Sequence, residues 1–317
     1  MSQVRPPGLL LHQAACFERF AQPMADALQQ ALPSRMSPFY DMLRYHLGLD
    51  DHGGSSGKQL RPALCLLVCE ALGGDWRTAL PAAASIELIH NFSLIHDDIQ
   101  DGDRERRHRP TVWAKWGVGQ AINAGDAMYC LAMLALNRFR QTAHEPLMGD
   151  MLGLLSEATR EIIEGQYLDL SYEALPQITL DQYLDMIQRK TGALIRASAE
   201  VGAMLAATTP HARLLARDFG ESLGKLFQVQ DDLLGVWGAP EATGKPVSAD
   251  IRRKKKSLPI VLALTVAPHA ERLELSSIYG QESLSDDDVL SRTSKQAKQC
   301  YRRFSCSNGS IAVSKGR

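Results

Sequence analysis

Two aspartate pairs carry the clearest chemistry in this sequence. Asp97 and Asp101, in the segment IELIHNFSLIHDDIQD, are four residues apart, so on a helix they share one face. Like charges at this spacing, close to the end of a helix, cost up to roughly 1 kcal/mol. A bound divalent cation would make this pair of negative charges stabilising instead of destabilising. Carboxylates favour Mg²⁺, which takes one or two of them and completes its shell with water and phosphate oxygens.

The alternative interpretation of this run, which also includes Asp98, is a solvated acidic helix end. The residues just before it are apolar, Phe92 among them, which indicates that the aspartates end a buried helix. A second pair, Asp231 and Asp232, ends another apolar pattern, KLFQVQDDLLG, in which Gln228 shares a face with Asp231. Two acidic helix ends in one bundle can oppose each other across a cavity, so the pairs together favour a site with several metal ions.

Basic residues occur where a metal-bound diphosphate would need them. Lys58 and Arg61 lie at a predicted helix start, where free N–H groups also attract phosphate. His90 is two helical turns before the first aspartates, although a lone histidine on an apolar helix is commonly a core residue. The segment 103–111, DRERRHRPT, lacks interleaved aromatic residues, so it is better interpreted as a phosphate clamp than as a nucleic-acid patch.

Further cations accompany the second aspartate pair. Lys190 and Thr191 lie inside an apolar helical pattern, and a lysine is rarely buried without a partner, so its ammonium is expected to reach a polar cavity. Lys245 and the basic run 252–256 follow the second pair, and part of that run is expected on the surface.

Helical spacing of apolar residues predicts the elements that position these groups. The clearest segments are 76–101, 113–143, 147–172, 179–207 and 211–237. Short connections between them predict antiparallel helices, and without a linker we expect one all-α domain over 1–317, a single large helical bundle around a central cavity. We expect residues 1–10 and roughly 283–317 to be frayed or atypical, with Asp286–Asp288 as a solvated helix start.

Composition narrows the class of protein. Lys plus Arg, 35 in number, nearly balance Asp plus Glu, 36 in number, which argues against nucleic acid as a partner. The six cysteines lack the paired spacing of a zinc site or a disulfide scaffold and favour a reduced compartment. There is no secretory signal pattern and no apolar run long enough to span a membrane, so we expect a cytoplasmic protein.

The ordered motifs resemble those of the trans-isoprenyl diphosphate synthases, the family of farnesyl and geranylgeranyl diphosphate synthases. The motifs occur in the family's order over about residues 55–265: GKQLRP, His90, DDIQD with RRHRPT, AGD, KTG, FQVQDD, TGKP and KKSLP. The resemblance implies an all-α fold of the isoprenoid synthase type. It also implies Mg²⁺-dependent condensation of isopentenyl diphosphate with an allylic diphosphate, by a homodimer.

The resemblance also implies roles for individual residues. The isopentenyl diphosphate set would be Lys58, Arg61, His90 and Arg107. Three Mg²⁺ ions, with Mn²⁺ as a possible substitute, would be held by Asp97 and Asp101 and by Asp231, and Asp98 belongs to the same catalytic set. The allylic diphosphate would be held by Arg106, Lys190, Lys245 and Lys255, with Thr191 and Gln228 facing the allylic cation.

Two features leave the product open. The second family motif usually ends in aspartate, whereas here Gly235 takes that place, so metal affinity or product range could be altered. In the family, bulk just before the first aspartates sets chain length. Phe92 and Ser93 stand five and four residues before Asp97, which resembles the geranylgeranyl synthases, so geranylgeranyl diphosphate is the favoured product. Phe92 as ordinary core, with farnesyl diphosphate as the product, is the alternative.

Two other functions share part of this motif pattern. A class I terpene cyclase shares the fold and the first motif but has no second diphosphate site, and Lys58, Arg61 and His90 argue against it. A non-catalytic subunit of a prenyl synthase would be expected to lose its aspartates, whereas this chain retains five of the six in the two motifs.

Overall fold

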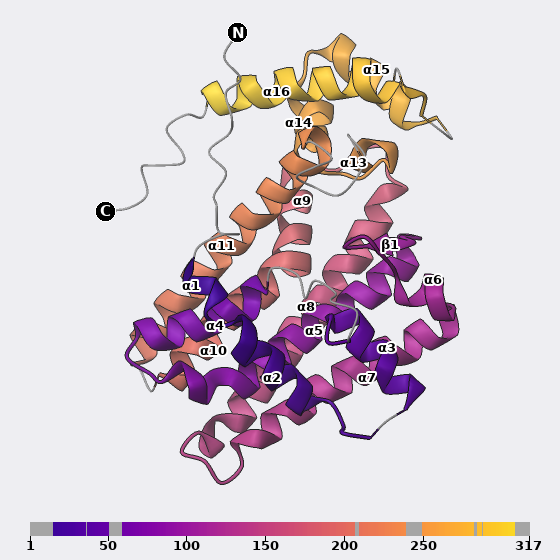
Figure 1. The fold of residues 1–317 in the computed structure, drawn as a ribbon. Helices are drawn as coiled ribbons and strands as arrows, with labels where there is room; N and C mark the ends of the chain where they lie inside the picture. The colour runs from indigo at the N-terminus through magenta and orange to yellow at the C-terminus, as the bar shows by residue number, and fades with distance from the viewer. Residues whose placement is uncertain are drawn as a thin grey trace. The chain divides into compact units, whose positions relative to one another are not determined.

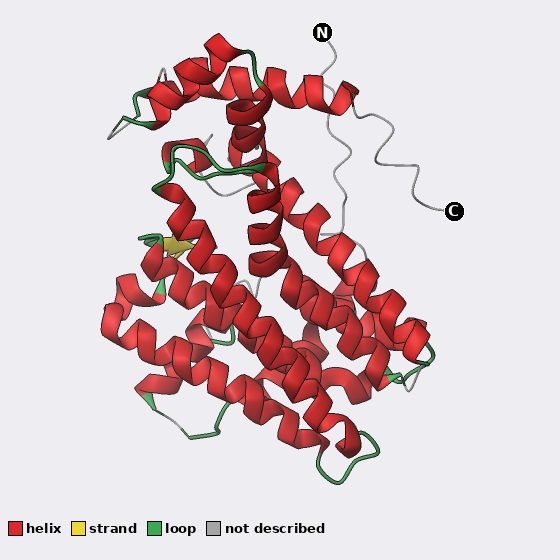
Figure 2. Cartoon of the chain, turned by 180° about the vertical axis from the view of Figure 1, so that it is seen from behind, coloured by secondary structure: helices red, strands yellow, loops and turns green. Residues whose placement is uncertain are grey.

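The computed structural model describes residues 15–35, 37–50, 59–206, 209–238, 249–281, 284–286 and 288–307 (Figure 1). These residues are almost entirely helical (Figure 2), and the strands among them are two residues long. The all-α class predicted from the sequence is therefore confirmed. The chain divides into two compact units, one of residues 1–159 with 194–220 and one of residues 160–193 with 221–317.

The first unit is built around one long buried helix, α5. Its elements are α1 (Ala15–Glu18), α2 (Ala21–Ala31), α3 (Pro38–Leu47), α4 (Leu60–Ala71), η1 (Trp76–Ala79), α5 (Leu80–Gln100), β1 (Glu105–Arg106), β2 (Arg109–Pro110), α6 (Val112–Trp116), α7 (Val118–Ala135), η2 (Leu136–Phe139), η3 (Glu145–Leu147), the start of α8 (Met148–Glu173), nearly all of α10 (Ala193–Leu205) and the start of α11 (Pro210–Trp237). Helix α5 packs along α7 and also contacts α2 and α4. Because α5 is buried on most sides, its last turn is held at a fixed place, and that turn carries the first aspartates.

The second unit contains the rest of α8 and α11 and the C-terminal helices. Its other elements are α9 (Leu180–Ile187), a π-helical turn η4 (Gln188–Gly192), α13 (Ala249–Arg252), α14 (Leu258–Val266), α15 (His269–Tyr279), a second π-helical segment η5 (Asp288–Thr293) and α16 (Ser294–Ser307). Thr179 begins α9 with a capping box, in which its hydroxyl accepts from the Gln182 N–H and the Gln182 side chain accepts from the Thr179 N–H. Helix α14 is buried from Leu258 to Leu264 and forms the centre of this unit's core.

Two predicted helices are interrupted in the structure. The segment predicted at 113–143 is divided at Gly117, whose positive φ of 88° ends α6 before α7 begins. The segment predicted at 179–207 contains the π-helical turn at residues 188–192. Apolar periodicity runs through both interruptions, so it could not reveal them.

The C-terminal segment differs from the expectation of a frayed tail over its described part. Val289, Ala297 and Cys300 are buried in the same apolar cluster as Leu264 of α14. Asp288 is also buried and accepts hydrogen bonds from Ser285, so the prediction of a solvated helix start is wrong for this residue. Within the described residues, no helix is both long enough and apolar enough to cross a membrane.

Candidate active site

The first aspartate site lies at the last turn of α5. Asp97 and Asp101 are one turn apart, and the Asp101 N–H donates to the Asp97 carbonyl over 2.8 Å, so the helical geometry continues through both residues. Both are partly exposed, whereas Asp98 is only 1% exposed. The predicted shared face of Asp97 and Asp101 is therefore present, and Asp98 points elsewhere.

Asp98 holds Arg106, from β1. The Arg106 Nε and one terminal nitrogen lie 2.8 and 2.7 Å from Oδ1 of Asp98. Burial raises the pKa of Asp98 to about 6, although Arg106 opposes the rise. Burial alone would lower the pKa of Arg106, but its hydrogen bond to Asp98 and the nearby aspartates raise it overall. Asp98 is thus a partner that positions the predicted phosphate-binding arginine close to the face formed by Asp97 and Asp101.

The basic segment after α5 folds as a tight hairpin that the sequence did not predict. Arg106 pairs with Arg109 across β1 and β2. Arg107 and His108 form the two-residue turn, with φ values of 53° and 61°. Left-handed conformations cost a residue with a Cβ roughly 1–2 kcal/mol, and such turns favour Asn-Gly for that reason. The hairpin thus places Arg106 and Arg107 at adjacent, fixed positions.

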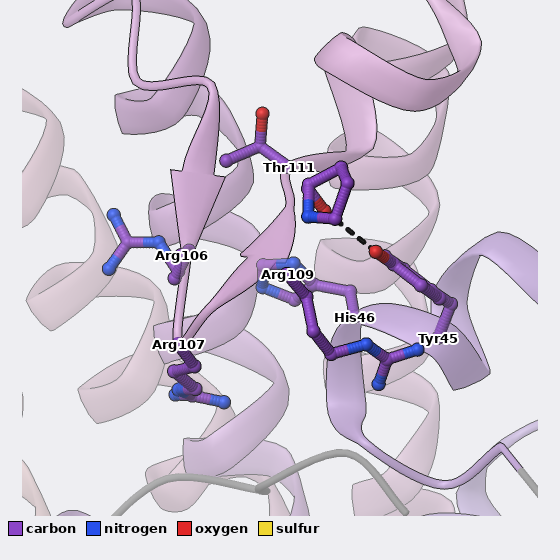
Figure 3. A pocket seen from close by; sticks show the side chains of 7 residues that line it. Tyr45, His46, Arg106, Arg107, Arg109 and Thr111 are labelled. Carbon is purple, nitrogen blue, oxygen red and sulfur yellow. Dashed lines mark hydrogen bonds between the residues drawn. The ribbon is translucent and has the colours of Figure 1, made fainter. Parts of the chain in front are cut away.

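A small pocket lies between this hairpin and α3 (Figure 3). Figure 3 shows the arginines and His46 gathered along it, and its lining consists of Tyr45, His46, Arg106, Arg107, Arg109, Pro110 and Thr111. Tyr45 donates to the Pro110 carbonyl over 2.8 Å, and Arg109 lies over the Tyr45 ring while pairing with Asp50. The concentration of guanidinium groups makes this end of the first unit suited to an anion.

Arg61 and His90 meet close to the same arginines. A terminal nitrogen of Arg61 lies 3.2 Å from Nε2 of His90. Burial first, and then the charges of Arg61, Arg107 and Arg106, hold the pKa of His90 well below its usual value. The ring is therefore neutral at pH 7. Since Arg61 can only donate, Nε2 accepts and the proton lies on Nδ1. Lys58, the remaining member of the predicted set, lies outside the described residues.

Two buried groups beside this set were not predicted as site residues. His46 has a pKa lowered to about 3 by burial and then by Arg106 and Arg107, and its Nε2 is buried without a hydrogen-bond partner. Glu87, 2% exposed, accepts from the Asn91 side chain over 2.9 Å. Its pKa is raised to about 7 by burial. In the sequence, Glu87 is a charged residue within an apolar stretch, three positions before His90. Because charged residues are rarely buried without a reason, this position could have been predicted as part of the site.

The predicted chain-length residues lie on α5 before the aspartates. Phe92 is 8% exposed, and its ring centre lies 5.1 Å from that of His96 and 5.5 Å from that of Tyr129, on α7. The Ser93 hydroxyl donates to the His90 carbonyl over 2.8 Å, within its own helix. Tyr129 therefore adds bulk beside Phe92 that the sequence motif did not reveal.

The second aspartate pair, at the end of α11, consists of one buried and one exposed residue. Asp232 accepts from the Tyr183 hydroxyl, from the Gln228 amide and from the Leu258 N–H over 2.7, 2.7 and 2.8 Å. Burial raises its pKa to about 6, against the effect of those three donors. Asp231 is exposed, which is compatible with its predicted role as a metal ligand.

The π-helical turn η4 carries Lys190 and Thr191. Lys190 forms an ion pair with Asp169 of α8. Burial alone would raise the pKa of Asp169, but Lys190 and Lys255 together lower it. The Thr191 hydroxyl donates to Gln228, which links this turn to Asp232. The close approach of η4 to α8 depends on Gly165 of α8, because a Cβ there would lie 2.2 Å from the backbone nitrogen of Lys190.

Asp169 is thus a site residue that sequence reasoning missed. In the sequence, Asp169 is a single aspartate in an amphipathic helical pattern, and that pattern does not distinguish it from an ordinary surface residue. Lys190 was expected to reach a polar cavity, and the structure provides the half-buried carboxylate of Asp169 as its partner. Lys245 lies outside the described residues.

The donor set suits Mg²⁺. Each site offers carboxylate oxygens, and within the described residues no three acidic, histidine or cysteine side chains form a closed metal cage. An open set of one or two carboxylates is the arrangement in which Mg²⁺ takes its remaining ligands from water and phosphate. The residues present therefore fit a magnesium ion that arrives with a diphosphate.

Comparisons with known proteins agree with this arrangement. The family model described as polyprenyl synthetase matches residues 47–296. A (2E,6E)-farnesyl diphosphate synthase of Mycobacterium tuberculosis is 43% identical over 256 residues, covering 78% of this chain and 70% of that protein. A geranylgeranyl diphosphate synthase of the same species is 39% identical over 283 residues, covering 84% and 76%. The crystal structure of a polyprenyl synthetase from Streptomyces coelicolor, 34% identical, matches with a TM-score of 0.78 over 91% of each chain.

Proposed function

The chain belongs to the polyprenyl synthetase family and is a short-chain trans-prenyl diphosphate synthase, and we propose that it condenses isopentenyl diphosphate with an allylic diphosphate in a Mg²⁺-dependent reaction. The observation that best supports the proposal is the end of α5. There the partly exposed face of Asp97 and Asp101 lies beside an arginine fixed by Asp98. Such a face holds a metal-bound diphosphate, which is the leaving group of this reaction.

In the proposed reaction the allylic C1–O bond breaks, and its electron pair leaves with the diphosphate. Bound Mg²⁺, as three ions in the family pattern and replaceable by Mn²⁺, would supply charge stabilisation for this leaving group. Asp97, Asp101 and Asp231 would hold the metal. Arg106 would add a fixed positive charge. No side chain of the described residues has to act as a strong base in this scheme.

The second substrate is isopentenyl diphosphate, whose double bond attacks the allylic C1 and forms the new C–C bond. This leaves a tertiary cation at C3 of the former isopentenyl unit; a proton then leaves C2, its electron pair forms the new C2=C3 double bond, and the departed diphosphate accepts the proton. We assign the binding of this substrate to Arg61, His90 and Arg107, together with Lys58. A neutral His90 with its proton on Nδ1 leaves the positive charge of this set to the arginines and the lysine.

The second aspartate site would bind the allylic substrate through the π-helical turn. We assign Lys190, Lys255 and Lys245 to its diphosphate. Thr191 and Gln228 would present oxygen atoms to the allylic cation, and their hydrogen bond fixes the orientation of the Gln228 amide. Asp232, held by three donors, would keep Gln228 and Asp231 in place.

We propose geranylgeranyl diphosphate as the product, on the ground that Phe92 is the bulky residue just before the first aspartates. The 43% identity to a farnesyl diphosphate synthase favours farnesyl diphosphate as the second candidate. The contact between Phe92 and Tyr129 also supports the shorter product, because two rings limit a tunnel more than one. A terpene cyclase and a non-catalytic subunit are less well supported, because Arg61, His90 and the metal-binding aspartates are all retained.

We also propose that the enzyme is a homodimer. Helix α7 exposes Val118, Ile122 and Leu134 at 46%, 44% and 56%, and Leu152 of α8 is 44% exposed. Large apolar side chains exposed to this extent on α7 and α8 favour a surface that another chain covers. Light scattering coupled to size-exclusion chromatography measures the state directly, and a monomer across micromolar concentrations would contradict this proposal.

The function is tested by incubating the protein with isopentenyl diphosphate and each of dimethylallyl, geranyl and farnesyl diphosphate, with Mg²⁺ or with EDTA. We expect elongation only with metal, and near-complete loss of it in Asp97→Ala. Asp181→Asn, at an exposed position of α9, is the matched control and should retain activity. Undiminished turnover in Asp97→Ala would refute the assignment of the metal site.

A further inference from the structure

The second aspartate site departs from the first at Gly235. In the first site Asp101 follows Asp97 by one helical turn, whereas Gly235 follows Asp231 by the same interval. Helix α11 therefore carries no second carboxylate on that face. The structure places the carboxylate of Asp250 directly against this glycine. A Cβ built on Gly235 would lie 1.9 Å from Oδ2 of Asp250 and 2.6 Å from its Cγ.

We propose that Asp250, from α13, supplies the second carboxylate of this metal site in the place where a side chain at position 235 would have done so. The inference rests on the proposed function, since it assigns Asp250 to the Mg²⁺ held by Asp231. The site would then have two carboxylates, as the first site has, with one of them delivered from a different part of the chain.

Packing around the two residues fixes their contact. Val236, next to Gly235, and Ile251, next to Asp250, are both fully buried in the same apolar cluster. The Lys255 N–H also donates to the Asp250 carbonyl over 2.9 Å, which closes the turn after α13. The approach of Asp250 to Gly235 is thus imposed from both sides of the contact.

The local charges also call for a cation. Asp231, Asp232 and Asp250 bring three carboxylates to the last turns of α11, and three hydrogen-bond donors stabilise Asp232. Asp231 and Asp250 are the two carboxylates that the proposed ion would use, and carboxylate pairs are a normal Mg²⁺ donor set.

The contact also explains the glycine. Any side chain at position 235 would overlap the Asp250 carboxylate, so Gly235→Asp adds a second carboxylate where one is already present. We expect this substitution, which makes the second motif resemble the first, to impair the protein. In the Asp250→Ala background we expect Gly235→Asp to be tolerated, because removing the Asp250 carboxylate opens the space beside position 235.

The first experiment measures Mg²⁺ affinity through the Mg²⁺ dependence of ligand binding, by calorimetric titration of a bisphosphonate into the protein at a series of Mg²⁺ concentrations. Asp250→Asn keeps the size of the side chain and removes its charge. We expect Mg²⁺ to bind about tenfold to a hundredfold more weakly to this variant, which is the usual effect of losing one supporting group of a metal site. The control Asp181→Asn should match the wild type. Unchanged affinity in Asp250→Asn would overturn the inference.

The second experiment exchanges the two positions. We expect Gly235→Asp to lower the melting temperature in EDTA, and Asp250→Ala to weaken Mg²⁺ binding. The double variant Gly235→Asp/Asp250→Ala should recover most of that binding, since the carboxylate now comes from α11. A folded double variant that binds Mg²⁺ no better than Asp250→Ala would contradict the proposal.

Different results would contradict the proposed function and the proposed role of Asp250. If wild-type protein shows no Mg²⁺-dependent binding of the bisphosphonate, the proposed function itself is wrong. If the wild type binds metal and Asp250→Asn binds it equally well, only the role of Asp250 is wrong. Because Asp250→Asn preserves the shape of the side chain, this comparison holds even where the exchange variants do not fold.

Discussion

Glu87→Gln should stabilise the protein at alkaline pH and leave its stability at acidic pH nearly unchanged. Glu87 is 2% exposed on α5, and one of its carboxylate oxygens is buried without a hydrogen-bond partner. Burial raises its pKa from 4.5 to about 7, while Asn91, Arg107 and Arg61 oppose the rise without cancelling it. Glutamine retains the shape and the acceptor for Asn91 but carries no charge.

The sign of the effect follows from proton binding. Between pH 4.5 and about 7 the folded state retains the Glu87 proton that the unfolded state has lost, so stability falls as the pH rises through this window. Above about pH 7 the loss of stability from ionising the buried Glu87 reaches its full value. The shift from 4.5 to about 7 corresponds to about 3 kcal/mol, which is an upper limit for the gain from the substitution. The free energy of unfolding should therefore depend less steeply on pH in Glu87→Gln than in the wild type.

Urea denaturation at pH 5 and pH 8 measures this difference. Glu18→Gln, at an exposed position of α1, controls for loss of a negative charge as such. The reasoning is refuted if Glu87→Gln is no more stable than the wild type at pH 8. It is also refuted if the two proteins differ by the same amount at both pH values, because a packing effect would not depend on proton binding.

Other substitutions test the remaining contacts. Phe92→Ala should lengthen the product, read by chromatography of the dephosphorylated alcohols, and an unchanged distribution would make Phe92 an ordinary core residue. Asp98→Ala leaves Arg106 without its partner and should cost roughly 3 kcal/mol in urea denaturation together with most of the turnover; wild-type turnover would show that Arg106 needs no support. Tyr183→Phe removes one donor to Asp232 and should cost about 1–3 kcal/mol by the same measurement, and no loss would mean that two donors suffice.

Much of the architecture could be predicted because the long apolar segments leave little choice. The segment 76–101 predicts a helix that is closely matched by η1 and α5. What periodicity could not supply is where such a segment changes geometry. Apolar residues continue through Gly117 and through the π-helical turn that carries Lys190, although each alters the direction of the side chains that follow. The cause in each case is local backbone conformation, which apolar spacing does not record.

The parts of the candidate site that contain clusters of charged residues could be predicted from the sequence, whereas the isolated charged residues could not. The aspartate run and the arginine-rich segment stand out in the sequence because clustered like charges repel one another and favour a ligand of opposite charge. Asp169, His46 and Asp250 each appear alone, and only the fold shows that Asp169 pairs with Lys190 and that Asp250 meets Gly235. Contacts between residues distant in sequence are set by packing, so no local pattern could have revealed them.

The two aspartate pairs show why adjacent identical residues take different roles. Consecutive residues on a helix point about 100° apart, so when one carboxylate faces the ligand its neighbour faces the protein. In each pair the first residue, Asp97 or Asp231, is at least partly exposed, and the second, Asp98 or Asp232, is buried against donors. Burying the second carboxylate would be unfavourable without those donors, and with them it fixes the groups around the first. In the proposed enzyme, an Asp-Asp pair near the end of a buried helix would thus combine one ligand for the metal with one anchor for the groups that surround it.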